Sequence, residues 1–303
     1  MHLGNGIICP VTGIPMLMLA GATAFYAFKK VRSNFSKDKI MTAVAVTSLV
    51  FAMQMMNFSI PMTGSSGHII GGILLAAILG PFAAFLAMCS ILLVQSVLFA
   101  DGGLLALGCN IFNMGFLACF LAYPFLYKPL ADRNKPLLGA ILASVAALQF
   151  GSLAVVFEGV LSGSIQLENA ASFAAFMQLI HLPIGIAEGF VTAAVILIAK
   201  NIDSKYLLIL FGGIAFVLAG FVAQYASQKP DGLEWALLKI SNSLALQTQG
   251  AIYALAETIQ AKTAIFTEIS SSFANIFGVI AVAFIIYTAM RILKLKAIKI
   301  DVK

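Results

Sequence analysis

The first three residues, Met1, His2 and Leu3, place three nitrogen donors in direct covalent succession. These donors are the terminal α-amine, the peptide nitrogen of His2 and the His2 imidazole. Once the peptide nitrogen loses its proton, they can bind one metal ion in a plane through two fused chelate rings. One further nitrogen would complete a four-nitrogen plane, which suits Ni(II) or Cu(II). The start of the chain therefore predicts a metal-binding terminus.

The prediction depends on whether the rest of the sequence brings a further histidine to this terminus. The chain offers two more, His68 and His181. A short motif has a high false-positive risk, and most chain termini are frayed and solvated. Because His2 is bulky, we expect Met1 to be retained and to supply the amine.

Composition indicates an all-α polytopic membrane protein. Of the 303 residues, 61% are hydrophobic and 10% are charged, whereas a soluble domain is nearer a quarter charged. The lipid bilayer is therefore the expected environment, and nucleic-acid binding is excluded. Four cysteines without C-x-x-C spacing are assigned neither a disulfide nor a metal role: Cys9, Cys89, Cys109 and Cys119.

Apolar runs of spanning length predict nine membrane crossings, because a crossing needs about 20 residues. The runs are Val11–Phe28, Ile40–Met56, His68–Leu79, Pro81–Leu98, Leu104–Tyr127, Leu137–Phe157, Phe173–Ala199, Tyr206–Val222 and Phe273–Ile292. An odd number of crossings places the two termini on opposite sides.

Basic residues orient these crossings, because Lys and Arg collect in cytoplasmic loops. Most of them follow the first, fifth, seventh and ninth runs: Lys29, Lys30, Arg32, Lys37, Lys39, Lys128, Arg133, Lys135, Lys200, Lys205, Arg291, Lys294, Lys296, Lys299 and Lys303. The sequence therefore predicts a cytoplasmic C-terminus and an N-terminus that is outside or reaches inward from outside.

The third run is too short to cross alone. A helix from His68 to Leu79 would cover about 18 Å at 1.5 Å per residue, and the hydrocarbon core is about 30 Å thick. The preceding Pro61–Gly67 is a poor helix former, because it contains Pro and several Gly. Non-helical backbone at membrane depth must lie inside protein or along a polar cavity. We therefore expect this loop to dip inward and carry His68 with it.

The N-terminal stretch can reach the same depth. Its nine residues precede Pro10, where the first helix can start, and extended they span up to roughly 30 Å. We therefore expect His2 and His68 to converge in one buried pocket that opens to the outside.

Four more polar residues lie inside predicted spans, where ionisable groups are candidates for function. Asn110 and Asn113 share one helix face at i, i+3. They either surround the metal ligands or form hydrogen bonds between helices. His181 and Glu188 are two turns apart on the seventh span. His181 is either a ligand or an inter-helix hydrogen-bonding group, and Glu188 is its partner or a structural acceptor.

A boundary near Lys200–Lys205 divides the chain into residues 1–203 and 204–303. The second part has two predicted spans around a polar loop, Gln224–Ser272. This loop contains Trp235 and the acids Asp231, Glu234, Glu257 and Glu268, and its centre, Leu233–Ala261, has a weakly amphipathic helical pattern. It contains no histidine, so we expect the metal ligands to lie before residue 203.

Several motifs resemble the substrate-binding membrane component of energy-coupling-factor importers for cobalt or nickel. They are Met1-His2 with Asn5-Gly6, Gly64-Ser65-Ser66-Gly67-His68 with Gly71-Gly72, the run from Ala106 to Met114, and the run from His181 to Glu188. Pro230-Asp231-Gly232-Leu233-Glu234 resembles the short accessory domain often fused to such components, chiefly in nickel systems. One departure is Asn5, where the family commonly has an acidic residue.

The resemblance implies a fold and a site. The fold is a seven-helix bundle followed by two additional transmembrane helices. The metal, Ni(II) in preference to Co(II), is held as the transported substrate by the Met1 amine, the backbone and ring nitrogens of His2, and the His68 ring. The residues expected around these ligands are Asn110, Asn113, His181, Glu188 and Ser66.

The resemblance also implies partners: a transmembrane coupling subunit and two cytoplasmic ATPase subunits, in a prokaryotic cell membrane and in a context of cobalamin biosynthesis. No G-x-x-x-x-G-K-[ST] occurs in the sequence, so energy must come from another subunit. The alternative is a membrane-embedded metalloenzyme, but the chain has no H-E-x-x-H helix. A cation channel would need a ring of carboxylates, and only Glu188 is expected to be clearly buried. The chain is therefore predicted not to be an enzyme.

Overall fold

The protein, described by a computed structural model, is a bundle of long helices. The structure describes residues 1–31, 37–240, 245–246, 248–267 and 271–300. The first part of the chain contains η1 (Asn5–Ile7), α1 (Pro10–Val31), α2 (Lys37–Gln54), β1 (Phe58–Ile60), β2 (Ser65–Gly67), α3 (Gly72–Leu79), α4 (Pro81–Leu98), α5 (Leu107–Ile111), η2 (Phe112–Tyr127), α6 (Lys128–Asp132), α7 (Pro136–Leu161) and α8 (Leu167–Lys200).

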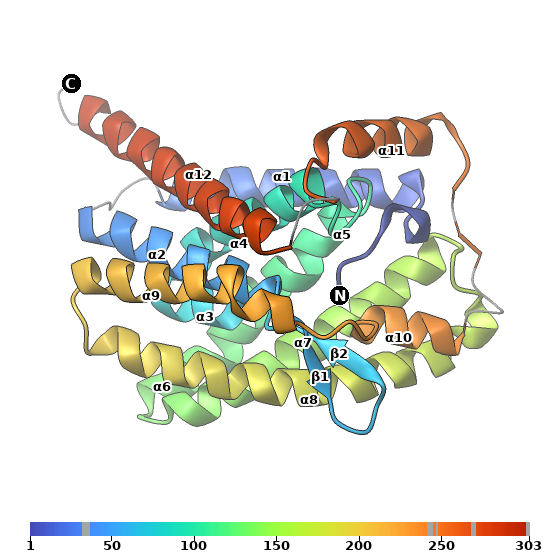
Figure 1. Cartoon of the computed structure of the whole chain (residues 1–303), viewed down its shortest axis with the longest axis horizontal. Helices are drawn as coiled ribbons and strands as arrows, with labels where there is room; N and C mark the ends of the chain where they lie inside the picture. Colours follow the sequence, from blue (N-terminus) through green and yellow to red (C-terminus); the bar gives the residue numbers. More distant parts are fainter. Residues whose placement is uncertain (32–36, 241–244, 247, 268–270, 301–303) are drawn as a thin grey trace.

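The second part contains α9 (Ser204–Gly220), η3 (Val222–Tyr225), α10 (Gly232–Lys239), α11 (Ala251–Thr263) and α12 (Ser271–Ile300). α9 packs on α2, and α12 packs on α2, α4 and α9. α10 packs on α8, and α11 lies against α4 and the N-terminal η1, at the other end of the molecule from the C-terminus (Figure 1). The helical pattern expected over Leu233–Ala261 corresponds to two helices, because α10 ends at Lys239 and α11 begins at Ala251.

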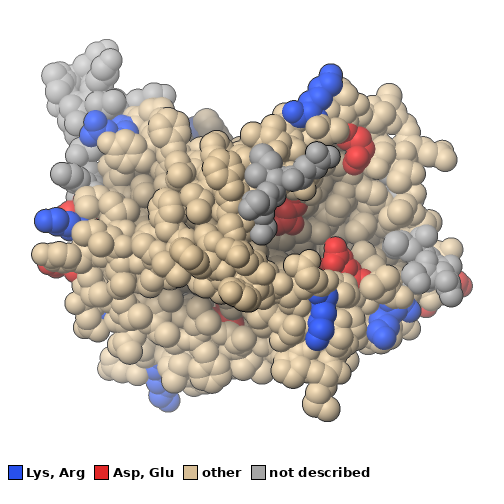
Figure 2. All heavy atoms as spheres, viewed as in Figure 1, with Lys and Arg blue, Asp and Glu red and all other residues tan. Residues whose placement is uncertain are grey.

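The helices confirm an all-α polytopic membrane protein. Within the described ranges, six helices are long and apolar enough to cross a membrane: α1, α4, the continuous helix Leu107–Asp132, α7, α8 and the segment Ser272–Ile292 of α12. The apolar helix α9 is shorter, at 17 residues. The exact count of seven plus two crossings stays a prediction. On the face in Figure 2, uncharged residues cover much of the surface, and the charged side chains lie mostly near the left end and over the right half.

The third apolar run folds differently from its expected helix. α3 begins at Gly72 and has eight residues, so His68 lies in an irregular segment before the helix. The residues before it form an antiparallel hairpin in which Ser59 pairs with Ser66. Gly71 has a φ of 76° and a Cβ there would lie 2.6 Å from a Val50 methyl group. The chain therefore turns sharply at Gly71, in a conformation that favours glycine.

The segment before α1 is part of the core. Leu3, Ile7 and Ile8 pack in one cluster with Val155 of α7 and Leu233 of α10. Leu3 is fully buried, which contributes about 1.5–3 kcal/mol relative to an exposed position. Apolar packing therefore holds the beginning of the chain inside the bundle, as Figure 1 shows for the N-terminus.

Candidate metal centre

The N-terminal residues are pinned by Asn110. The Leu3 N–H donates to Asn110 Oδ1 at 2.8 Å, and Asn110 Nδ2 donates to the Leu3 carbonyl at 3.1 Å. The Gly103 N–H donates to the same carbonyl at 2.8 Å. Both side-chain atoms of Asn110 therefore bond to the residue that follows His2, and its role beside the expected metal ligands stays a prediction.

His2 and His68 come together, as the sequence predicts. Their ring centroids lie 5.1 Å apart with an interplanar angle of 33°. His2 Nε2 is 3.1 Å from Gln95 Oε1, and His2 Nδ1 is 3.7 Å from Asp101 Oδ1. These contacts orient the imidazole ring, as surrounding groups do for a metal-binding histidine.

His68 has a buried nitrogen without a partner. Its side chain is 7% exposed, and Nδ1 makes no hydrogen bond. Burial lowers the pKa of His68 well below its usual value, and the positive terminal amine lowers it further. An unpaired buried polar atom costs about 1–3 kcal/mol, and an ion that binds there would explain it. A neutral imidazole is also the form that binds metals.

Glu188 fixes the segment that carries His68. Its two carboxylate oxygens accept from the N–H groups of Ile70 and Gly71 at 2.8 and 3.1 Å. Gln54 Nε2 donates to the Ile70 carbonyl at 2.6 Å. Of the two roles considered for Glu188, it is the structural acceptor, because its bonds go to the backbone after His68.

His181 lies at the same place but is bonded elsewhere. Its Nδ1 donates to the Met177 carbonyl at 2.7 Å, so its lone pair is on Nε2. A Cβ at Gly232 would lie 3.3 Å from that atom. The structure brings His181 to the cavity without bonding it to His2 or His68, so its role as a ligand stays open.

Asn113 and Ser66 make contacts away from the two ligand rings. Asn113 Nδ2 donates to Glu158 Oε2 at 2.7 Å. Glu158 is 3% exposed, so the expectation that only Glu188 is clearly buried is wrong. The predicted apolar run ended one residue before this acid. Ser66 Oγ donates to the Lys229 carbonyl at 2.8 Å, which ties the hairpin to the C-terminal part of the chain.

Sequence reasoning missed three residues of this site: Gln95, Asp101 and Asp231. Asp231 Oδ2 lies 3.4 Å from the Met1 amine. The Asp231-to-Glu234 spacing is that of a capping box, and the structure contains one. That signal could have located the start of α10, but no local signal showed that the same carboxylate reaches the first residue.

Met1 and His68 line a very small cavity. It has a volume of about 10 Å³, room for about one water molecule or ion, and its lining is Met1, Gly67, His68, Ile70, His181, Ile184, Asp231 and Gly232. The described residues contain no group of three or more His, Cys, Asp and Glu side chains that could hold a metal. A metal here would therefore depend on the terminal amine and the backbone.

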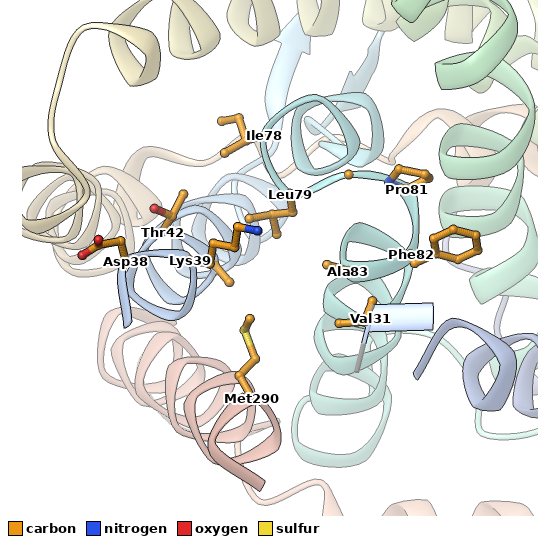
Figure 3. Close-up of a pocket in the computed structure, with 12 residues that line it drawn as sticks. Val31, Asp38, Lys39, Thr42, Ile78, Leu79, Pro81, Phe82, Ala83 and Met290 are labelled. Carbon is orange, nitrogen blue, oxygen red and sulfur yellow. The ribbon is translucent and has the colours of Figure 1, made fainter. Parts of the chain in front are cut away.

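A larger cavity of about 370 Å³ lies elsewhere, between the ends of α2, α3 and α12 (Figure 3). Its lining is mostly apolar and includes Lys39, Pro81 and Met290 but no histidine or cysteine. It therefore lacks the imidazole ligands that suit transition metals such as Ni(II). The small cavity at Met1 and His68 is therefore the candidate metal centre.

The sequence and the fold are those of a known class of membrane protein. Residues 2–206 match the family described as the cobalt uptake substrate-specific transmembrane region, and residues 205–295 match the PDGLE domain. The chain belongs to the cobalt uptake family and carries a PDGLE domain after it. These are families of metal transport proteins, so the prediction that the chain is not an enzyme is confirmed.

Individual relatives agree with this membership. A protein of Archaeoglobus fulgidus, named as a candidate fused nickel transport protein, is 34% identical over 205 residues, which cover 65% of this chain and 64% of the relative. The cobalt transport protein of Clostridium tetani is 25% identical, over 70% of this chain and 89% of its own. The crystal structure of a truncated transition metal transporter superposes with a TM-score of 0.57 at 31% identity, over 65% of this chain and 96% of that one.

Proposed function

We propose that this chain is the substrate-binding component of an ATP-driven energy-coupling-factor importer for a divalent transition metal. One observation carries the proposal. Met1 and His68 line a cavity of atomic size, the His2 ring lies 5.1 Å from the His68 ring, and the buried His68 Nδ1 has no hydrogen-bond partner. Nothing larger than an ion fits such a cavity, and its donors are nitrogens.

The donor set supports Ni(II) in preference to Co(II). The Met1 amine, the backbone and ring nitrogens of His2 and the His68 ring make four nitrogen donors, which suit the tetragonal geometry of Ni(II). The two-part organisation supports the same choice, because the relative from Archaeoglobus fulgidus is named as a fused nickel transport protein. Other relatives are named for cobalt, so Co(II) is the second candidate substrate.

An importer of this kind needs partner subunits and a defined orientation in the membrane. The sequence has no phosphate-binding loop of the G-x-x-x-x-G-K-[ST] type, so we assign ATP hydrolysis to two cytoplasmic ATPase subunits and energy transfer to a transmembrane coupling subunit. We place the chain in a prokaryotic cell membrane, and the distribution of basic residues supports an N-terminus outside and a C-terminus in the cytoplasm. In this orientation the metal arrives from outside at the end of the bundle that contains Met1.

Metal analysis of the purified full chain tests the proposal. The protein is loaded with equimolar Ni(II) and Co(II), and the bound metals are counted and their absorption spectrum is recorded. We expect one ion per chain, mainly Ni(II), and a spectrum of planar nitrogen coordination. His2→Ala and His68→Ala should each abolish stoichiometric binding and leave the protein folded. Binding that survives either substitution would refute the site.

A further inference from the structure

The two carboxylate oxygens of Asp231 make different contacts. Oδ1 accepts from the Glu234 N–H at 2.8 Å and so caps the start of α10. Oδ2 lies 3.4 Å from the terminal amine of Met1, which is 230 positions away in the sequence. One side chain of the PDGLE domain therefore contacts a proposed metal ligand of the preceding domain.

Independent hydrogen bonds fix the backbone on both sides of Asp231. The Pro230 carbonyl accepts from the Ser66 N–H at 2.8 Å, and Trp235 Nε1 donates to the Thr63 carbonyl at 3.0 Å. On its other side, Gly232 packs on His181, since a Cβ at Gly232 would lie 3.1 Å from the Cε1 atom of that ring. The carboxylate is thus held at the cavity by the segment before His68 and by α8.

The contact between Asp231 and the amine is shielded from water. The side chains are 16% exposed for Asp231 and 1% for Met1. A buried charge needs a charged or hydrogen-bonded partner to be tolerated. The terminal amine and Asp231 supply such partners for each other.

We propose that Asp231 is a positioning residue for the metal site. It holds the terminal amine at the wall of the cavity beside His68, and it remains there as a negative neighbour when the cation is bound. This inference rests on the proposed function, because it assigns a role to Asp231 through the amine ligand. The PDGLE domain then completes the site, whereas the sequence suggested a site formed by residues 1–203 alone.

Two substitutions in the full chain separate this role from that of a helix cap. Asp231→Asn retains a side chain that caps helices well but removes the charge that faces the amine. Glu234→Ala removes the other half of the capping box and leaves the contact with Met1 in place. We expect Asp231→Asn to weaken Ni(II) affinity by about 10–100-fold, as the loss of a group that supports a metal ligand does. Glu234→Ala should bind Ni(II) like the unchanged protein.

Reactivity of the amine gives a second readout that helix capping would not change. With an acylating reagent and mass analysis of the N-terminal peptide, the amine of Asp231→Asn should react faster than that of Glu234→Ala or the unchanged protein. Unchanged affinity and reactivity in Asp231→Asn would overturn the inference, as would an equal loss of affinity in Glu234→Ala. His68→Ala is measured in parallel. If His68→Ala loses binding while Asp231→Asn does not, only the positioning role of Asp231 fails. If the unchanged protein binds no metal, the proposed function fails.

Discussion

The rings of His2 and His68 lie 5.1 Å apart inside the helical bundle, and each is held by a different element. Gln95 of α4 bonds to the His2 ring, and Glu188 of α8 bonds to the backbone just after His68. The distance between the rings therefore depends on how α4 and α8 sit in the bundle. Such support by surrounding residues is what a metal site needs to keep its ligands in register.

Asn110→Ala should release the N-terminal segment. It leaves the Leu3 N–H without its acceptor and removes one donor to the Leu3 carbonyl, and each unpaired buried group costs about 1–3 kcal/mol. Because the amine and His2 would lose their anchor, Ni(II) affinity should fall by about 10–100-fold. Titration calorimetry measures the affinity. Asn113→Ala is the comparison, because Asn113 lies on the same helix but bonds to Glu158. Equal affinities in the two variants would contradict the anchoring role of Asn110.

Glu188→Ala should loosen the segment that carries His68. The N–H groups of Ile70 and Gly71 lose their acceptors, at about 1–3 kcal/mol for each group, so both thermal stability and Ni(II) affinity should fall. Glu188→Gln keeps one acceptor oxygen and should show a smaller loss. The control is Glu168→Ala, an exposed position in the first turn of the same helix, which should change stability by less than about 0.5 kcal/mol. Scanning fluorimetry in detergent compares the three variants, and a loss in Glu168→Ala equal to that in Glu188→Ala would count against this role.

Long-range patterns in the sequence predicted much of this architecture. The apolar runs gave nearly all of the long helices, and the break at Pro61–Gly67 predicted an inward segment with His68. The details at this segment could not be predicted, because α3 starts at Gly72 through contacts of Gly71 with Val50 and of its N–H with Glu188. These partners are far apart in the chain, and their meeting depends on how whole helices pack.

The metal site was predictable only in part, for a similar reason. Met1, His2 and His68 carry their chemistry in their own side chains and termini, so composition and spacing could identify them. Gln95 and Asp231 act only through the partners that they contact. Asp231 carries a local capping signal, but its second contact crosses from the last third of the chain to the first residue.

The stability of the metal-free protein should fall as the pH falls below about 6.5, the ordinary pKa of a histidine. Burial and the nearby terminal amine lower the pKa of His68 in the folded state, so the unfolded chain takes up a proton there that the folded chain does not. By linkage, each pH unit between the two pKa values costs about 1.4 kcal/mol. Between pH 7.5 and 5.5, the unchanged protein should therefore lose more thermal stability than His68→Asn. Parallel losses in the two proteins would contradict the low pKa of His68.

An alanine inserted between Met1 and His2 tests most directly whether the terminal amine is a metal ligand. The insertion preserves both histidines, but it places two peptide nitrogens between the amine and the His2 ring. The chelate formed by the amine, one peptide nitrogen and the ring can then no longer form. A matched control carries an alanine inserted after Asn134, in the exposed turn between α6 and α7. Ni(II) affinity and the absorption spectrum are measured on both proteins. We predict that the N-terminal insertion changes both the absorption spectrum and the Ni(II) affinity, because it adds a second peptide nitrogen to the chelate, while the control keeps both. Unchanged affinity and an unchanged spectrum after the N-terminal insertion would show that the amine is not a ligand.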